Sequence, residues 1–281
     1  MRATAPVTED QEVLGGCGCQ DPWSAVLGAT VGASRTPFRP TRRNLLIAAG
    51  LLIARPFRAG AAEGGGQRDL TPHLAAYGLA VNPRSAWAGT AVAPARNLAV
   101  EDDVRVLIVH HAETPNGYAA EKVPALIRGI HSFHTGPEKG WPDVAYGFFI
   151  DRFGIVWEAR TASLTSATAG SATGGNQGFS RLVCLLGDYR SVVPTAATLD
   201  SLAKLLAALA DLHRIDTKPT AVATFVSRGS NRWKKGEKVE VPTISGHRQL
   251  SRTACPGDAA FAIVQGSLPS SVEQLRSSRR K

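Results

Sequence analysis

Val104-Arg-Val-Leu-Ile-Val-His-His111 is the stretch that decides the fold of this chain. It is apolar, rich in β-branched residues and ends in two histidines, a pattern typical of a strand buried inside a sheet. In sheets of this kind, functional side chains gather where the strands end. We therefore expect His110 and His111 to lie at a sheet edge where a site can form.

The segments that follow alternate between helical and strand patterns. Apolar residues repeat every three or four positions over 120–134 and 195–213, so both ranges are predicted helices with one face on a sheet. Ranges 144–150 and 155–160 are predicted to form a β-hairpin, and 181–186 a further strand.

The last third of the sequence predicts an exposed hairpin over 227–238, a loop that ends at His247, and a short helix that opens at Cys255-Pro-Gly257. The resulting fold class is α/β, with a single mixed β-sheet flanked by helices and a candidate site at strand and loop ends.

The density of these patterns predicts the division of the 281 residues. Residues 101–266 form the predicted domain. Residues 1–62 are a predicted leader, 63–100 a Gly-, Ala- and Pro-rich linker and approach arm, and 267–281 a polar, basic tail.

The leader contains the pattern of an export signal. Thr41-Arg-Arg-Asn-Leu-Leu46 continues into an apolar stretch that ends at Ala54, and Ala59-Gly-Ala61 offers a cleavage site. The apolar stretch is too short to span a bilayer, so we expect export by the twin-arginine route and no stable membrane anchor. A basic leader without export is the alternative.

The formal net charge of +9 indicates a polyanionic environment, which nucleic acid, anionic lipid or wall polymer would satisfy. Hydrophobic residues make up 43% of the chain and charged residues 20%, as in ordinary soluble domains. Because the sequence lacks a nucleic-acid fold motif or an aromatic and basic platform, nucleic acid is not an expected partner. A monomer is expected.

Four cysteines are present, and Cys17 and Cys19 precede the predicted signal. Cys184 lies in an apolar run and is interpreted as a buried strand residue. Cys255 then has no obvious disulfide partner.

His110, His247 and Cys255 form a sound zinc set at the ends of predicted elements. Three protein ligands leave a fourth position for water, whose pKa zinc lowers to about 7. Spacing alone leaves other readings open: a buried thiol, a hydrogen-bonded loop histidine, or a rival metal pair of His131 and His134 on one helix.

Local strings add specificity to this set. They occur in one order along the chain: Ile108-Val-His-His-Ala112, Gly140-Trp-Pro-Asp-Val-Ala-Tyr-Gly-Phe-Phe149, Asp151-Arg-Phe-Gly-Ile-Val-Trp-Glu-Ala-Arg160, Ser245-Gly-His-Arg248 and Thr253-Ala-Cys-Pro-Gly257. Over about residues 82–265 the chain resembles the zinc amidase family of peptidoglycan recognition proteins and bacteriophage lysozyme-type amidases. The inserted stretch 227–233 resembles that of actinobacterial secreted members.

The resemblance implies that His110, His247 and Cys255 bind Zn²⁺, that Tyr146 is catalytic and that Thr253 assists. It further implies hydrolysis of the amide between N-acetylmuramic acid and L-alanine (EC 3.5.1.28), with peptidoglycan or muropeptides as partners. A tyrosine hydroxyl can exchange protons with an attacking water, and a threonine hydroxyl can donate to an oxyanion.

The chain also departs from the family pattern. Ala172 stands where the family has a cleft-lining histidine, Ala159 replaces the glycine of Glu-Gly-Arg, and Gln249 replaces the aspartate of Gly-His-Arg-Asp. None of these changes removes a proposed ligand. The missing histidine motivates an alternative function, a non-catalytic peptidoglycan-binding module.

Overall fold

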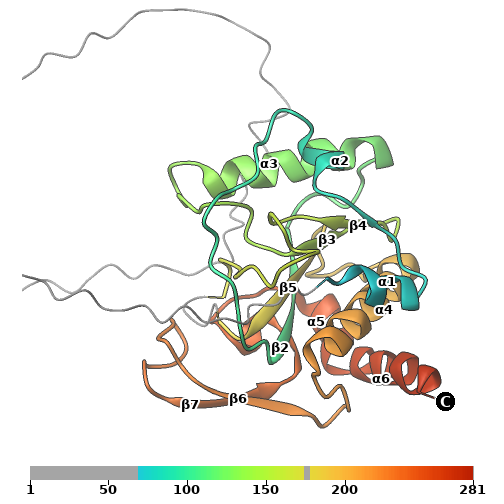
Figure 1. Cartoon of the computed structure of the whole chain (residues 1–281), viewed down its shortest axis with the longest axis vertical. Coiled ribbons are helices and arrows are strands. Elements are labelled where there is room, and N and C mark those ends of the chain that lie inside the picture. The colour runs from blue at the N-terminus through green and yellow to red at the C-terminus, as the bar shows by residue number, and fades with distance from the viewer. Residues whose placement is uncertain (1–68, 174–177, 281) are drawn as a thin grey trace, which may run out of the picture. The chain divides into compact units, whose positions relative to one another are not determined.

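A mixed β-sheet lies at the centre of the residues that this computed structural model describes, 69–173 and 178–280 (Figure 1). Within that part of the chain the sheet has six strands in the order β1-β4-β3-β5-β2-β8. Their bounds are Val81–Asn82 (β1), Val106–His111 (β2), Phe148–Ile150 (β3), Val156–Glu158 (β4), Ser180–Leu185 (β5) and Ile244–Gly246 (β8).

The strand directions confirm the predicted mixed sheet. β3 and β4 form the predicted antiparallel hairpin, whereas β2 pairs parallel with both β5 and β8. β3 is also parallel to β5, so four neighbouring strands end at the same edge of the sheet. A separate two-stranded antiparallel hairpin consists of β6 (Val222–Val226) and β7 (Lys238–Pro242).

Helices flank the sheet, as predicted. Figure 1 shows α2 and α3 together in one group and α1, α4, α5 and α6 in another, with the sheet between them. Their bounds are Thr71–Ala76 (α1), Ser85–Ala88 (α2), Val123–Thr135 (α3), Ala196–His213 (α4), Asp258–Gln265 (α5) and Ser267–Arg279 (α6). Two short 3₁₀ turns precede α3 and follow β8, at Ala120–Lys122 and His247–Gln249.

The core lies between β2, β5 and helix α4. Strand β2 is buried along its whole length, because helices cover both faces of a largely parallel sheet. Leu107 and Val109 of β2 belong to the same apolar cluster as Leu205 and Leu209 of α4. Successive side chains on a strand point to opposite faces, so the neighbours of Leu107 and Val109 point to the α3 side.

The predicted linker 63–100 contains ordered elements, which corrects that prediction. α1, β1 and α2 all form within it, and β1 extends the sheet by pairing parallel with β4. Leu70 and Trp87 are fully buried. These elements escaped the sequence pattern because each is six residues or shorter, too short to show a helical or strand period.

The predicted tail 267–281 is also corrected. Its residues up to Arg279 form helix α6, which packs on α4 and buries Leu268 and Val272. Arg276 is buried as well and donates to the Asp211 carboxylate at 2.7 Å and to the Ile215 carbonyl at 2.8 Å. The basic composition of the segment concealed one apolar, anchored face.

The predicted leader and its twin-arginine signal lie outside the described residues. Among the helices that are described, none combines the length and the apolar character needed to cross a bilayer.

Candidate active site

Two histidines meet because two parallel strands end side by side. Val109 of β2 is paired with Gly246 of β8, and the next residue along each strand is His110 and His247 respectively. Their rings lie 4.4 Å apart between centroids, tilted by 43°. The expectation that histidines gather at this sheet edge therefore has a direct cause in the strand register.

Cys255 completes a buried group of three. Its Sγ lies 3.7 Å from Nδ1 of His110, and the ligand atoms of His110, His247 and Cys255 all lie within 4.8 Å of one another. Within the described part of the chain, this is the group of His, Cys, Asp and Glu side chains arranged to hold a metal ion. Two imidazoles and one thiolate fit Zn²⁺, and three ligands leave one position open.

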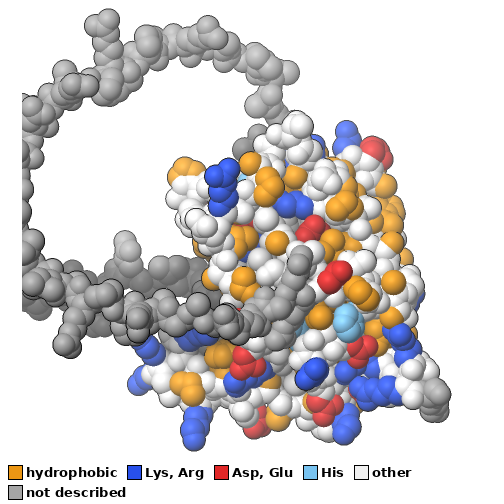
Figure 2. Space-filling view, in the orientation of Figure 1, with side chains coloured by type: hydrophobic (Ala, Val, Ile, Leu, Met, Phe, Trp, Pro, Cys, Tyr) orange, Lys and Arg blue, Asp and Glu red, His pale blue; other side chains and the backbone are white. Residues whose placement is uncertain are grey.

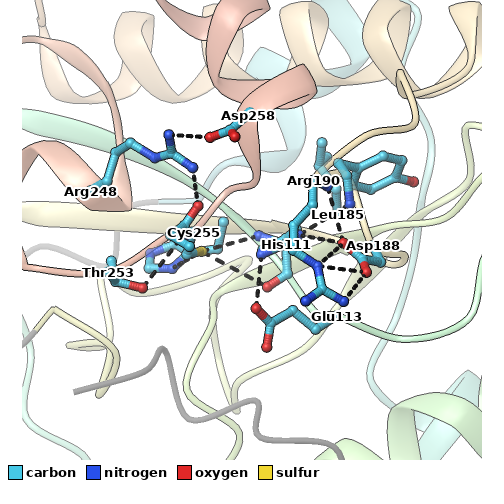
Figure 3. A network of polar contacts seen from close by, with 12 residues as sticks. His111, Glu113, Leu185, Asp188, Arg190, Arg248, Thr253, Cys255 and Asp258 are labelled. Carbon is cyan, nitrogen blue, oxygen red and sulfur yellow. Dashed lines mark hydrogen bonds and ion pairs between the residues drawn. The ribbon is translucent and has the colours of Figure 1, made fainter. Parts of the chain in front are cut away.

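His111 faces away from this group, as strand alternation requires. Its ring Nδ1 accepts a hydrogen bond from the Tyr189 N–H at 3.2 Å, and Nε2 lies 3.4 Å from the Glu113 carboxylate. Its backbone N–H nevertheless donates to Sγ of Cys255 at 3.4 Å. Figure 3 shows His111 between Cys255 and the Asp188 side.

An ion pair between Arg190 and Asp188 lies beyond His111. The Arg190 guanidinium binds the Asp188 carboxylate and holds the pKa of Asp188 below its ordinary value. The side-chain amide of Asn116 pairs with both backbone groups of Asp188, donating to its carbonyl at 2.8 Å and accepting from its N–H at 2.8 Å. These contacts fix the loop that supports the His111 ring.

Tyr146 lies on the same face of the sheet as His110. The two rings are 4.9 Å apart between centroids, and the Tyr146 side chain is 1% exposed. On its other side the Tyr146 ring packs edge-on against His134 at 5.6 Å. The sequence-predicted tyrosine is thus placed beside the candidate metal centre.

Thr253 lies two residues before Cys255 and contacts its backbone. The Thr253 hydroxyl oxygen accepts the Cys255 N–H at 3.2 Å, which leaves its own O–H able to donate elsewhere. Arg248 braces the same loop by donating to the Ala254 carbonyl and to the Asp258 carboxylate, as Figure 3 shows.

Two glycines permit the close packing of this loop. A side chain at Gly246 would approach the Phe261 ring at 2.8 Å and Pro256 at 3.0 Å. Gly257 has φ of +85°, and a side chain there would lie 2.3 Å from the Tyr189 backbone. The glycines of the Gly-His and Cys-Pro-Gly strings are therefore required because the site has no room for a side chain at Gly246 or Gly257.

His131 and His134, the rival metal pair, are placed apart from the group of three. His131 Nε2 lies 3.6 Å from the buried Asp143 carboxylate, and burial lowers the pKa of His131. His134 Nδ1 accepts the Ala145 N–H at 3.2 Å and so holds the backbone next to Tyr146. Both histidines are satisfied by protein groups.

Comparison with known families agrees with this geometry. The family described as N-acetylmuramoyl-L-alanine amidase matches residues 100–258, more than half of the chain. The chain belongs to this family. Human N-acetylmuramoyl-L-alanine amidase is 29% identical over 190 residues, covering 66% of this chain and 28% of the human protein. The match therefore spans well under half of that relative.

Peptidoglycan-recognition proteins are also among the relatives of this chain. Peptidoglycan-recognition protein SD of Drosophila simulans is 28% identical over 163 residues, covering 57% of this chain and 71% of its own. Among solved structures, bumblebee PGRP-SA has a TM-score of 0.52 at 18% identity, covering 67% of this chain and 95% of its own. PGRP-LE, solved in complex with tracheal cytotoxin, has a TM-score of 0.51 at 23% identity and covers 66% and 92%. These structures share the fold.

Within this amidase fold, Ala172 is 6% exposed and lies near the segment before β3 that contains Tyr146. The neighbouring Ser171 N–H donates to the Ala145 carbonyl at 3.1 Å. A methyl group thus occupies the position where the sequence pattern predicts a histidine in the family, two residues before the stretch 174–177 that the structure does not describe.

The structure adds residues that the sequence did not single out. Asn231, at the end of the β6–β7 hairpin, accepts the Arg252 N–H at 3.0 Å and donates to the Arg252 carbonyl at 3.4 Å. Arg232 donates to the Arg248 carbonyl at 2.6 Å. The insertion at 227–233 was visible in the sequence, but its attachment to the Cys255 loop depends on long-range packing.

Proposed function

We propose that this protein is a zinc-dependent N-acetylmuramoyl-L-alanine amidase, which hydrolyses the amide between N-acetylmuramic acid and the L-alanine of the stem peptide. One observation carries the proposal: His110, His247 and Cys255 converge in a buried group, with Tyr146 packed against one of the ligands. Family membership and the names of the amidase relatives support the same substrate class.

His110, His247 and Cys255 would hold the metal. When bound, zinc supplies a Lewis acid that activates water and polarises the amide carbonyl. The backbone N–H of His111 donates to the Cys255 sulfur and so favours the thiolate form that serves as a ligand. The Gly246 and Gly257 backbones let the ligand-bearing loops approach within contact distance.

Tyr146 and Thr253 would act on the reacting groups. The ring of Tyr146 is held between His110 and His134, and its hydroxyl would donate a hydrogen bond to, or exchange a proton with, the attacking water. The Thr253 oxygen already accepts the Cys255 N–H, so its hydroxyl proton is available for the oxyanion that develops on the carbonyl. Fixed donors of this type stabilise the transition state because they need no reorganisation.

Mass spectrometry of muropeptide digests tests the proposal. The zinc-loaded protein is expected to release free stem peptides that begin with L-alanine and to leave the glycan intact. Cys255→Ser should abolish release, whereas Cys184→Ala, a change to the buried cysteine of β5, should preserve it. A zinc-loaded protein that binds muropeptides and releases no peptide would identify the non-catalytic binding module instead.

Export from the cytoplasm by the twin-arginine route is part of the same proposal. It rests on the paired arginines and short apolar stretch of residues 41–54. Export agrees with an activity against intact peptidoglycan, since that polymer lies outside the membrane.

A further inference from the structure

The turn that joins β6 to β7, residues 227–237 and here called the hairpin tip, is strongly basic. From Ser227 to Lys238 the sequence has five basic residues and one acidic residue, against 32 basic and 23 acidic residues in the whole chain. All five basic side chains are exposed: Arg228, Arg232, Lys234, Lys235 and Lys238. Figure 2 shows Lys and Arg side chains along the edge of the molecule where the hairpin lies.

Hydrogen bonds within the hairpin tip hold its backbone in one conformation. The Ser230 hydroxyl accepts the N–H groups of Arg232 and Trp233 at 3.1 and 3.0 Å. The single acidic side chain, Glu237, is engaged by the Lys234 N–H at 3.0 Å. Cations presented on an ordered turn lose less entropy on binding than cations on a mobile chain.

The hairpin tip is attached to the loop of the candidate active site. Asn231 pairs with both backbone groups of Arg252, the residue before Thr253, and Arg232 donates to the carbonyl of Arg248. Arg252 is itself exposed and adds a cation to the surface. Any polymer held by the tip is therefore held next to Thr253 and Cys255.

Guanidinium groups cover the aromatic rings of this region. Arg228 lies 4.7 Å above the Phe179 ring and Arg232 lies 5.1 Å above the Trp233 ring. Nucleobases need free aromatic faces on which to stack, and a guanidinium group covers one face of each of these rings. A stacked guanidinium keeps its N–H groups directed outward in its own plane, where they can bind phosphate or carboxylate oxygens. The surface fits a partner recognised by its anions.

We propose that the hairpin tip together with Arg252 binds the anionic groups of cell-wall polymer, and so holds polymeric substrate beside the candidate metal centre. The shared chemistry is a row of oxyanions, which phosphodiesters of a wall-attached glycopolymer or carboxylates of stem peptides would supply. This inference rests on the proposed function for its choice of polymer. It adds that intact wall, rather than a released fragment, is the preferred substrate.

Co-sedimentation of the full chain with purified, insoluble wall tests the binding surface. The variant Lys234→Ser/Lys235→Ser is compared with a matched control, Lys122→Ser/Lys218→Ser, which removes two exposed lysines elsewhere. Wild type and control are expected to bind equally, with affinity that falls steeply between about 50 and about 200 mM salt. The tip variant should bind about tenfold more weakly with a shallower salt dependence, because fewer counterions are released.

Two treatments of the wall distinguish the source of the anions. Hydrofluoric acid removes phosphodiester-linked polymers, and amidation of carboxyl groups neutralises the stem peptides. Loss of binding after either treatment supports the proposal and assigns the source. Binding that survives both treatments together, or equal binding by the tip variant and the control, overturns it.

Duplex and single-stranded DNA serve as competitors in the same assay. Displacement of the wild type by DNA at a lower anion concentration than soluble wall polymer would overturn the choice of wall polymer. Unfolding temperature and zinc content show whether each variant is folded. Because binding is measured without turnover, salt-dependent wall binding with no peptide release would contradict the proposed hydrolysis alone, and peptide release without tip-dependent binding would contradict this inference alone.

Discussion

The backbone N–H of His111 donates to Sγ of Cys255 at 3.4 Å, although the two residues are 144 positions apart in the sequence. The contact joins the end of strand β2 to the Cys-Pro-Gly loop, and it leaves the His111 ring free to pair with Tyr189 and Glu113. One histidine of the His-His pair is thus a candidate ligand through its ring, and the other supports a ligand through its backbone.

Zinc is expected to stabilise the folded protein through this group. A ligand that binds only the folded state, at about 1,000 times its Kd, adds roughly 4 kcal/mol, which is on the order of 10 °C in Tm for a domain of this size. Thermal unfolding with and without a chelator should show this shift in wild type and in Cys184→Ala. Cys255→Ser should show little of it, and an equal shift in that variant would exclude Cys255 as a ligand.

Tyr146→Phe should separate chemistry from structure. The phenyl ring keeps the packing against His110 and His134 and loses only the hydroxyl. We expect kcat on muropeptides to fall by about 10²- to 10⁴-fold, with zinc content and Tm close to those of wild type. Tyr77→Phe is the control and should retain kcat. The Tyr77 hydroxyl donates to Asp211 of helix α4, away from the candidate metal centre. Undiminished turnover by Tyr146→Phe would remove this residue from the mechanism.

Asn231 is predicted to position Thr253 through Arg252. Asn231→Ala removes both hydrogen bonds to the Arg252 backbone and should lower kcat about tenfold, because small misplacements of a reacting group are costly. Asn231→Asp keeps the acceptor for the Arg252 N–H, so its kcat should lie between that of wild type and that of Asn231→Ala. In a double-mutant cycle, Asn231→Ala should have little further effect once Thr253 is replaced by alanine. Fully additive losses would mean that Asn231 acts elsewhere.

His131 should make stability depend on pH. Burial lowers the pKa of His131 in the folded state, so as pH falls the unfolded state takes up this proton first. Stability is therefore lost as pH drops below the ordinary histidine pKa of about 6.5. Urea unfolding between about pH 7.5 and 5.5 should show a shallower loss for His131→Gln than for wild type. If the unfolding free energy of wild type and of His131→Gln fell equally with pH, His131 would not be the source of the pH dependence. A reduced zinc content in His131→Gln would instead indicate that His131 is a metal ligand.

Arg276 is predicted to fix helix α6 to the domain. Arg276→Ala removes the buried donor to the Ile215 carbonyl and one of the two donors to the Asp211 carboxylate, which keeps the Tyr77 hydroxyl, and should cost about 2 kcal/mol of unfolding free energy. Arg280→Ala removes an exposed arginine of the same segment and should cost less than about 0.5 kcal/mol. Chemical denaturation measures both. If both variants lost similarly little unfolding free energy, Arg276 would not anchor residues 267–279 to the domain.

The sequence predicted best those elements that are long enough to show a repeating pattern of buried residues. Strand β2 and helix α4 were visible because buried residues recur along them, whereas β8 was predicted as a loop because its three residues are too few to show a period. Helix α6 was not recognised because its buried residues lie in a run of serines and arginines; they are Leu268, Pro269, Val272 and Arg276. Four buried positions in thirteen do not stand out from the polar background.

The candidate site was predicted in part for a similar reason. His110, His247, Cys255, Tyr146 and Thr253 lie in distinctive local strings, so their types and order were informative. The contacts of Asn231 with Arg252 and of Asn116 with Asp188 depend on how loops that are distant in sequence fold against each other. An asparagine in a turn has the same local signature whether it clamps a neighbouring loop or faces solvent.

Because His110 and His111 point to opposite faces of the sheet, the register of strand β2 decides which of them faces Cys255. Its pairing with β5, His110 opposite Cys184 and His111 opposite Leu185, selects which imidazole enters the metal group. Deleting one residue upstream in the strand would move His111 into the position of His110, whereas inserting one residue would move Val109 into that position. The two directions of slippage would therefore have different consequences: a one-residue deletion would still present a histidine toward Cys255, whereas a one-residue insertion would present a valine and leave the metal group one ligand short.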